Sequence, residues 1–334
     1  MTRPPDFWTR DDWRALMLSP LSRAVAKITA HRIARGGWRA PVPVICCGNA
    51  TVGGAGKTTL ALDLAYRLKA RGIAVHTLSR GYGGSARGPR RVMPGDTAAT
   101  TGDEALLLAE AVPTWIGADR AASARLAIAA GAELLLMDDG LQNPSLQKSM
   151  SLLVVDGTTG FGNGRVLPAG PLREPVAAAA ARCRAVVLIG QDSSGAMAQL
   201  PSDIQVLPAN LVQGDEIAGL VGRRVLAFAG LAIPDKFFGA LERAGVRLAG
   251  REAFADHHAF TAVDLARLTA NATALDAILV TTPKDAARLP AGANVVVVGV
   301  RLVWETEAAI EALLDELVFG AAPNSPPRPG TSMA

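Results

Sequence analysis

Cysteine, histidine and aromatic residues are scarce in this chain of 334 residues, and long apolar runs are absent. The three cysteines lack the paired spacing of metal sites and disulfide frameworks. We therefore expect them to be free thiols that serve as small core residues in a protein of a reducing compartment. No stretch of 18 uncharged apolar residues occurs, and the N-terminal segment lacks the apolar core of a signal peptide. With 49% hydrophobic and 19% charged residues, the composition is that of a globular protein large enough for two domains.

Positive charge is concentrated at the N-terminal end. Residues 1–39 carry eight basic and three acidic side chains, a net charge of +5, whereas the whole chain has a net charge of +4. Between residues 21 and 35, basic and apolar side chains alternate with a helical period. The basic residues are Arg23, Lys27, His31 and Arg35, the apolar ones are Leu21, Ala24, Val25 and Ile28, and the flanking aromatic residues are Phe7, Trp8, Trp13 and Trp38.

This basic segment has two interpretations. A basic amphipathic helix with aromatic anchors is typical of a segment that lies on an anionic membrane surface. A basic helix that packs against its own domain would show the same pattern. Nucleic-acid binding is not expected, because the basic surface is confined to one arm and no recognition motif accompanies it.

The most informative motif is GNATVGGAGKTT at residues 48–59, between an apolar strand pattern and a helical pattern. Its glycines let backbone N–H groups converge on phosphate oxygens, and the following helix adds its dipole. Lys57 is expected to contact the β- and γ-phosphates of ATP, and the Thr58 hydroxyl to bind Mg²⁺, whereas a simple tight turn would need neither residue. The predicted phosphate-binding residues are Thr51, which replaces the usual first glycine, and Val52, Gly53, Gly54, Ala55, Gly56, Lys57 and Thr58.

The order of apolar segments predicts a doubly wound α/β fold of the P-loop NTPase type with a mostly parallel sheet. Continuous apolar runs alternate with helical patterns between residues 42 and 189, as in strands buried in a parallel sheet. The pattern weakens near residues 207–216 and then restarts, which predicts a second, smaller α/β domain. The expected divisions are an N-terminal amphipathic helix at 1–38, a P-loop domain at 39–215, a smaller domain at 216–320 and a disordered tail at 321–334.

Two adjacent acids, Asp138 and Asp139, follow an apolar strand pattern. An acid at the end of a strand beside a P-loop is typical of a Mg²⁺ site. Neighbouring strand residues point to opposite faces, so one acid is expected at the metal and the other at a loop or substrate group. A polar turn is the alternative, but two buried acids would repel each other without a cation.

Three further segments carry charged groups: GDE at 102–104, GPLREP at 170–175 and DHH at 256–258. The first opens a helix, where the dipole by itself favours an acid. The second holds Arg173, a candidate clamp for phosphate, beside Glu174. The third joins two of the four histidines to an acid, without further evident ligands for a metal site.

In their order, the motifs GNATVGGAGKTT, SRGYGG, GDE, DDGLQ, GPLREP, DHH and TTPKDAARL resemble those of the tetraacyldisaccharide 4'-kinases, the lipid A 4'-kinases. The resemblance extends from about Trp8 to Leu317. It implies transfer of the γ-phosphoryl group of ATP, with Mg²⁺, to the 4'-hydroxyl of a lipid A disaccharide 1-phosphate. It also implies a P-loop kinase domain, a smaller α/β domain and a membrane-associated N-terminal helix at the cytoplasmic face of the bacterial inner membrane. We expect the protein to be a monomer.

The resemblance also implies roles for individual residues. Asp103 corresponds to the base for the sugar hydroxyl, with His257 as its partner. Closure of the smaller domain would bring this pair together and exclude water. The implied catalytic residues are Asp103, His257, Lys57, Asp139, Arg173 and Glu174, and the implied metal ligands are Thr58, Asp138 and Asp139.

Two other classes of protein share the core of this P-loop. ATPases and GTPases that partition, target or insert other proteins carry it, and several of them work at membranes. GTP specificity usually needs Asn/Thr-Lys-x-Asp, whereas Lys284 is followed directly by Asp285, so ATP is expected. A non-catalytic nucleotide sensor at a membrane would not need the acidic and histidine residues named above. Phosphate transfer to a lipid separates the kinase from both classes.

Overall fold

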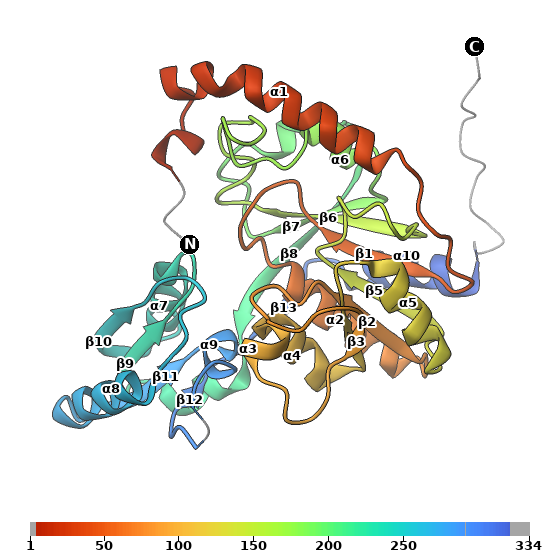
Figure 1. Cartoon of the computed structure of the whole chain (residues 1–334). Helices are drawn as coiled ribbons and strands as arrows, with labels where there is room; N and C mark the ends of the chain where they lie inside the picture. The colour runs from red at the N-terminus through yellow and green to blue at the C-terminus, as the bar shows by residue number, and fades with distance from the viewer. Residues whose placement is uncertain (1–4, 291, 321–334) are drawn as a thin grey trace, which may run out of the picture.

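The computed structural model describes residues 5–290 and 292–320, so the tail expected at 321–334 lies outside the described residues. A sheet of nine strands forms its centre (Figure 1). The strands are β1 (Val44–Gly48), β2 (Val75–Ser79), β3 (Arg90–Arg91), β4 (Thr114–Ile116), β5 (Leu134–Asp138), β6 (Met150–Asp156), β7 (Ala185–Ile189), β8 (Gln205–Gln213) and β13 (Val300–Trp304).

The strand order is β13-β8-β7-β6-β1-β5-β2-β4-β3. All neighbours pair in parallel except the edge strands β13 and β3, which are antiparallel to β8 and β4. The P-loop NTPase-type α/β fold with a mostly parallel sheet is therefore confirmed. Ligands of such sheets bind beyond the carboxyl ends of the strands, and β1 and β5 are neighbours at the centre.

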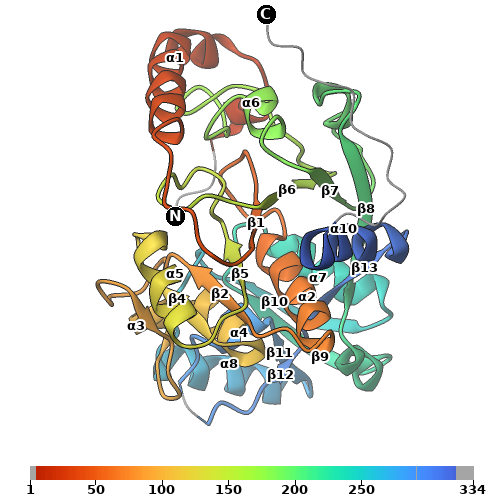
Figure 2. The same cartoon turned by 90° about the vertical axis from the view of Figure 1, so that its right-hand side faces the viewer.

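Helices cover both faces of the large sheet, because alternate strand residues need a core on each side. Ile45 of β1 packs in one core and Val44 in the other. Figure 2 shows these layers. The first core contains α2 (Lys57–Ala70), α4 (Asp103–Ala111) and α10 (Glu307–Phe319). The second core contains α5 (Arg120–Ala129), α6 (Val176–Ala180) and part of α1 (Trp13–Ile33). Short helices lie at Asp6–Trp8, Ala98–Thr101, Met197–Gln199 and Asp215–Leu220.

A second sheet of four parallel strands lies to one side of the first (Figure 1). It has its own two apolar clusters, one on each face. We call it, with its helices, the smaller unit. It contains β9 (Arg224–Ala229), β10 (Arg247–Ala253), β11 (Ile278–Thr281) and β12 (Val296–Val297), in the order β10-β9-β11-β12, with α7 (Pro234–Arg243), α8 (Ala262–Ala274) and α9 (Pro283–Ala286).

Residues 300–319 depart from the expected division, because β13 and α10 return to the large sheet. β13 pairs with β8, and Trp304 Nε1 donates a hydrogen bond of 2.9 Å to Asp63 Oδ2 on α2. Ile310 and Leu314 of α10 are buried in the core beneath α2. Placing the whole of 216–320 in the smaller domain was wrong, since apolar periodicity does not reveal which sheet a strand joins.

The helix α1 lies across the top of the molecule over α6 (Figure 1). Asp12 caps its N-terminus, and Ser22 Oγ on its inner face accepts a hydrogen bond of 3.1 Å from Ala169 N. Of the flanking aromatic residues, Trp8 donates to Pro168 O and Trp38 stacks under Arg125, so both hold the protein together. None of the helices in the described ranges has the length and apolar character needed to cross a bilayer.

Candidate active site

The P-loop joins β1 to α2 and has the backbone that its glycines permit. Gly53 and Gly56 have φ angles of +116° and +86°, which other residues rarely adopt. A Cβ atom at Gly56 would also lie 2.5 Å from Ile189 Cδ1. Lys57, the first residue of α2, donates from Nζ to Asn49 Oδ1 at 3.2 Å and to Gly53 O at 3.3 Å. The loop therefore presents its lysine and its helix N-terminus on the same side.

The start of the P-loop is held by the segment 170–175. Val52 N donates to Pro171 O at 2.8 Å, and Arg173 N donates to Ala50 O at 2.7 Å. Thr51 forms an isolated β-bridge with this segment, which accounts for a residue other than glycine at the first position of the motif. The same pairing brings Arg173 to the edge of the phosphate site.

Asp138, at the end of β5, faces the P-loop. Its Oδ2 accepts a hydrogen bond of 3.0 Å from the Thr58 hydroxyl, and its Oδ1 is buried without a partner among the described residues. Burial, with the charges of Glu104 and Asp139, raises the pKa of Asp138 to about 7. A cation would satisfy Oδ1 and favour the ionised carboxylate, so Thr58 and Asp138 fit a Mg²⁺ site. No group of three or more histidine, cysteine or acidic residues suits a metal in the described ranges.

Asp139 follows the end of β5 with a φ of +50° and has a different partner from Asp138. The two terminal nitrogens of Arg173 contact its two carboxylate oxygens at 2.7 and 3.0 Å, a bidentate pair. Lys57 Nζ lies 3.8 Å from Oδ1 of the same group. Burial alone would raise the pKa of Asp139, but the charges of Lys57 and Arg173 outweigh it and lower the pKa.

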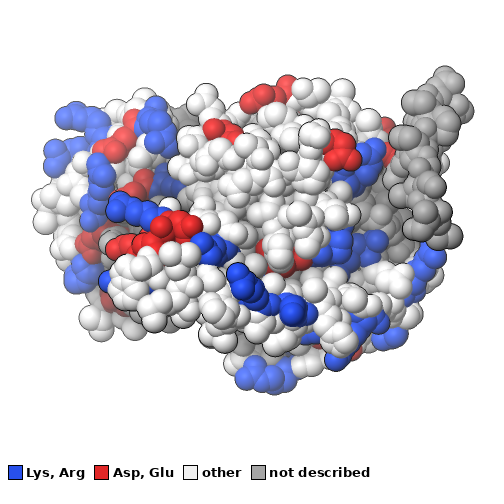
Figure 3. All heavy atoms as spheres, turned by 90° about the horizontal axis from the view of Figure 1, so that it is seen from above, with Lys and Arg blue, Asp and Glu red and all other residues white. Residues whose placement is uncertain are grey.

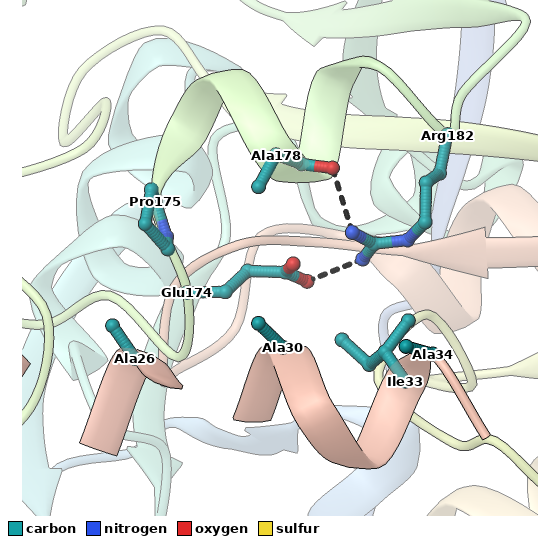
Figure 4. A pocket seen from close by; sticks show the side chains of 8 residues that line it. All are labelled: Ala26, Ala30, Ile33, Ala34, Glu174, Pro175, Ala178 and Arg182. Carbon is teal, nitrogen blue, oxygen red and sulfur yellow. Dashed lines mark hydrogen bonds and ion pairs between the residues drawn. The ribbon is translucent and has the colours of Figure 1, made fainter. Parts of the chain in front are cut away.

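Glu174 is buried one step away from the phosphate site. Its carboxylate accepts hydrogen bonds from Gln142 at 2.8 Å and Arg182 at 2.7 Å, and Gln142 in turn accepts one from Arg173 at 3.3 Å. It forms a wall of a groove of about 360 Å³ between α1 and α6, together with Pro175 and several alanines (Figure 4). Among the described residues, the contacts of Glu174 therefore lead to Asp139 only through Gln142 and Arg173.

Asp103 and His257 meet although they are 154 residues apart. Asp103 begins α4 on the large sheet, and His257 follows β10 in the smaller unit. His257 Nδ1 lies 3.1 Å from Asp103 Oδ2, and the Tyr82 ring contacts the imidazole edge-on. His257 has a φ of +57°, a conformation that non-glycine residues adopt mainly where surrounding structure imposes it. The pair spans the two parts of the molecule.

The electrostatics of this pair favour a carboxylate beside a proton-bearing imidazole. Asp103 is 3% exposed, and burial alone would raise its pKa. The hydrogen bond from His257 and the charges of Lys284 and Arg288 lower that pKa below its ordinary value. The hydrogen bond to Asp103 raises the pKa of His257. Asp103 is thus held as an ionised carboxylate.

Two basic residues at the site, Lys284 and Arg288, were not assigned to it from the sequence. Lys284 Nζ lies 2.5 Å from Glu104 Oε1, and Arg288 Nε lies 3.5 Å from Asp103 Oδ2. Both belong to the TTPKDAARL motif, whose position in the sequence gave no indication of this contact. His258, in contrast, pairs with Asp264 inside the smaller unit, 3.3 Å away.

The buried acid Asp103 belongs to the P-loop domain, and the smaller unit supplies the histidine that contacts it. A P-loop with such an acid–histidine pair suits transfer of a phosphoryl group to an acceptor hydroxyl, so the fold and the site are those of a P-loop kinase. The model of one family, described as tetraacyldisaccharide-1-P 4'-kinase (LpxK), matches residues 14–318. The chain belongs to this family.

Similar proteins agree with this assignment. The tetraacyldisaccharide 4'-kinase of Gluconacetobacter diazotrophicus is 55% identical over 316 residues, which cover 93% of this chain and 97% of the relative. That of Gluconobacter oxydans is 50% identical over 325 residues, covering 96% and 99%. The solved "apo" form LpxK from Aquifex aeolicus in complex with ATP is 26% identical, with a TM-score of 0.73 and coverage of 91% and 99%. The chain is therefore an ATP-dependent kinase that phosphorylates a hydroxyl group.

Proposed function

We propose that this kinase transfers the γ-phosphoryl group of ATP to the 4'-hydroxyl of a tetraacyldisaccharide 1-phosphate, a step of lipid A biosynthesis. The observation that carries the proposal is the contact of 3.1 Å between Asp103 and His257, which supplies a base beside the P-loop domain. The names of the relatives support this acceptor.

In the proposed reaction, Asp103 accepts the proton of the 4'-hydroxyl. The hydroxyl oxygen forms a bond to the γ-phosphorus, and the bond from that phosphorus to the β,γ-bridging oxygen breaks to release ADP. His257 holds the carboxylate in place through Nδ1. An alcohol is a poor nucleophile at neutral pH, so a base within hydrogen-bond reach contributes about 10²- to 10⁴-fold.

The phosphate end of the reaction depends on charge. Lys57 and Arg173 stabilise negative charge on the transferring group, with Asp139 fixing the orientation of Arg173. Thr58 and Asp138 would hold Mg²⁺, which neutralises phosphate charge when bound. Glu174 supports this arrangement through Gln142.

We also propose that α1 docks on an anionic membrane surface, the cytoplasmic face of the inner membrane. Trp13, Met17, Leu21 and Ile28 form an exposed apolar ridge along the helix, with exposed fractions of 64, 71, 56 and 64%. Val25, expected on this face, packs instead against the protein. Figure 3 views the face from above: uncharged atoms cover its middle, and Lys and Arg side chains lie along its lower edge. Exposed basic residues flank the ridge at Arg14, Arg23, Lys27 and Arg32.

Replacing Trp13, Met17 and Ile28 together by serine is expected to raise the KM for acceptor lipid in anionic vesicles by at least about tenfold, since three buried apolar side chains would be lost from the bilayer. ATP affinity should be unchanged. Val263→Ser, at an equally exposed apolar residue on α8, is the matched control. An equal loss of ATP affinity in the triple variant would contradict membrane docking and indicate a structural role for α1.

The reaction itself is tested with two labelled nucleotides. ATP labelled in the γ-phosphate should transfer label to a tetraacyldisaccharide 1-phosphate in detergent micelles, whereas α-labelled ATP should not. An acceptor already phosphorylated at the 4'-hydroxyl is the control and should remain unlabelled. ATP hydrolysis without any lipid labelling would contradict the proposal and favour an ATPase that acts on a protein partner.

A further inference from the structure

Arg288 is a buried cation with no role in the proposed reaction. It follows α9 in the smaller unit, and its side chain is only 6% exposed. Its Nε lies 3.5 Å from Oδ2 of Asp103, the oxygen that His257 Nδ1 contacts at 3.1 Å. Two groups from the smaller unit therefore converge on one oxygen of the base.

The peptide of Gly230 ties these two groups together. Its carbonyl accepts hydrogen bonds of 3.2 Å from both His257 N and Arg288 Nη2. Its N–H donates to Asp285 Oδ1 at 3.0 Å, which also accepts from Arg288 Nη2 at 2.8 Å. Arg288 and His257 are therefore both anchored to Gly230, the residue that follows β9.

The pairing of Arg288 with Asp285 is costly as a means of stabilising the smaller unit. Asp285 is fully buried, and burying an ion pair usually costs as much as the attraction returns. Moreover, Arg288 Nη1 is buried and has no hydrogen-bond partner among the described residues. These features fit a guanidinium held for the sake of its charge at the boundary between the two sheets.

We propose that Arg288 is a positioning residue for the kinase reaction: it sets a fixed positive charge against Oδ2 of Asp103 and orients that carboxylate for the acceptor hydroxyl. Because Arg288 and His257 share one attachment point, the base is complete only when the smaller unit lies against the P-loop domain. The inference rests on the proposed role of Asp103 as the base. Lys284 supplies a second charge there through Glu104.

A separate contact between the two parts of the molecule provides a control. Lys236 Nζ on α7 pairs with Asp156 Oδ2 at the end of β6, at 2.5 Å. Neither residue contacts Asp103. Lys236→Met therefore weakens the approach of the smaller unit without changing the charge at the base.

The key variant is Arg288→Met combined with Asp285→Asn, which removes both buried charges and leaves an amide oxygen for the N–H of Gly230. We expect kcat for lipid phosphorylation to fall about 100-fold, the usual consequence of a misplaced catalytic group. The KM for ATP and the melting temperature should stay near wild type. Arg288→Lys should restore part of the loss, and Lys236→Met should reduce kcat far less.

The pH profile gives a readout that a structural role would not change. The groups that face Asp103 are His257, Arg288, Lys284 and, through the last, Glu104. Asp285 also acts on Asp103 by its charge, and the double variant removes it together with Arg288. Arg288 Nε lies 3.5 Å from Asp103 Oδ2, whereas Asp285 contacts Arg288 but, among the described residues, not Asp103, so the loss of the positive charge outweighs the loss of the negative one. The pKa of Asp103 should rise, and the acid side of the kcat profile should move to higher pH in the double variant.

Two outcomes separate failure of this inference from failure of the base assignment. If Asp103→Asn slows transfer but the Arg288 and Asp285 double variant retains kcat within threefold of wild type, Arg288 has no positioning role. If Asp103→Asn itself retains kcat, the base assignment fails and the inference fails with it. In an Asp103→Asn background, the double variant should cause no further loss, whereas a full additional loss would show that Arg288 acts elsewhere.

Discussion

Replacing Asp103 by asparagine is expected to lower kcat by about 10²- to 10⁴-fold, because the amide cannot accept the proton of the acceptor hydroxyl. Asparagine keeps the shape of the side chain and an oxygen for the N–H of Glu104, which donates to Asp103 Oδ1 at 2.9 Å. The fold and the P-loop should therefore be unaffected. Initial rates of lipid phosphorylation and the dissociation constant for ATP, measured on the same preparation, test this expectation.

Asp156→Asn is the matched control for this variant. Asp156 lies at the carboxyl end of β6, where its Oδ1 accepts hydrogen bonds from Thr158 N and Thr159 N and its Oδ2 pairs with Lys236. It has no contact with the P-loop or His257 among the described residues. Because Asp156→Asn weakens the same pair as Lys236→Met, it should lower kcat only as far as Lys236→Met does, far less than Asp103→Asn. An Asp103→Asn enzyme with kcat within tenfold of wild type would remove Asp103 from the chemistry.

Replacing Lys57 by alanine is expected to lower phosphoryl transfer by about 10³-fold or more, because the lysine contributes a positive charge at the transferring group where little water competes. Its Nζ is held by Asn49 and Gly53, so the ammonium is placed before the nucleotide binds. Transfer of γ-label to lipid measures the effect.

Lys69→Ala, in the last turn of the same helix, is the control for Lys57→Ala. Lys69 Nζ donates to Ala111 O at 3.1 Å and has no contact with the P-loop. Its loss should leave transfer close to wild type. A Lys57→Ala enzyme that transfers phosphate within tenfold of wild type would contradict the placement of the γ-phosphate.

The parts of the fold with local signals could be predicted from sequence. The runs at β1, β5, β6 and β7 are apolar because both faces of these strands are buried, and this pattern identifies a parallel sheet without further information. The P-loop could also be predicted from sequence, because Gly53 and Gly56 occupy backbone conformations that other residues avoid.

The parts that depend on long-range partners could not be predicted. β8 has mixed burial, so its apolar pattern is weak although it is nine residues long. The sequence did not show which side of α1 packs against the protein: Leu21 and Ile28 are exposed, whereas Val25 packs against the second core. A helix rich in both apolar and basic residues offers no internal rule for this choice.

Some residues of the active site could likewise be predicted from sequence, and others could not. Asp138 and Asp139 could be placed at the end of a strand, but β5 ends at Asp138, and Asp139 has a φ of +50° outside it, so the alternation of strand side chains does not set the direction of Asp139. Asp103 and His257 have no such signal, and only the resemblance to a kinase family joined them. Arg288 emerged from the structure alone, because its contact with Asp103 crosses between two sheets.

The most direct test of the account is a double-mutant cycle on Asp103 and His257 by single-turnover phosphorylation with saturating ATP. Asp103→Asn, His257→Gln and the combined variant should have similar rates, because the two side chains act as one unit and losing either disables it. Losses that multiply in the combined variant would contradict the account, since they would show that Asp103 and His257 act independently.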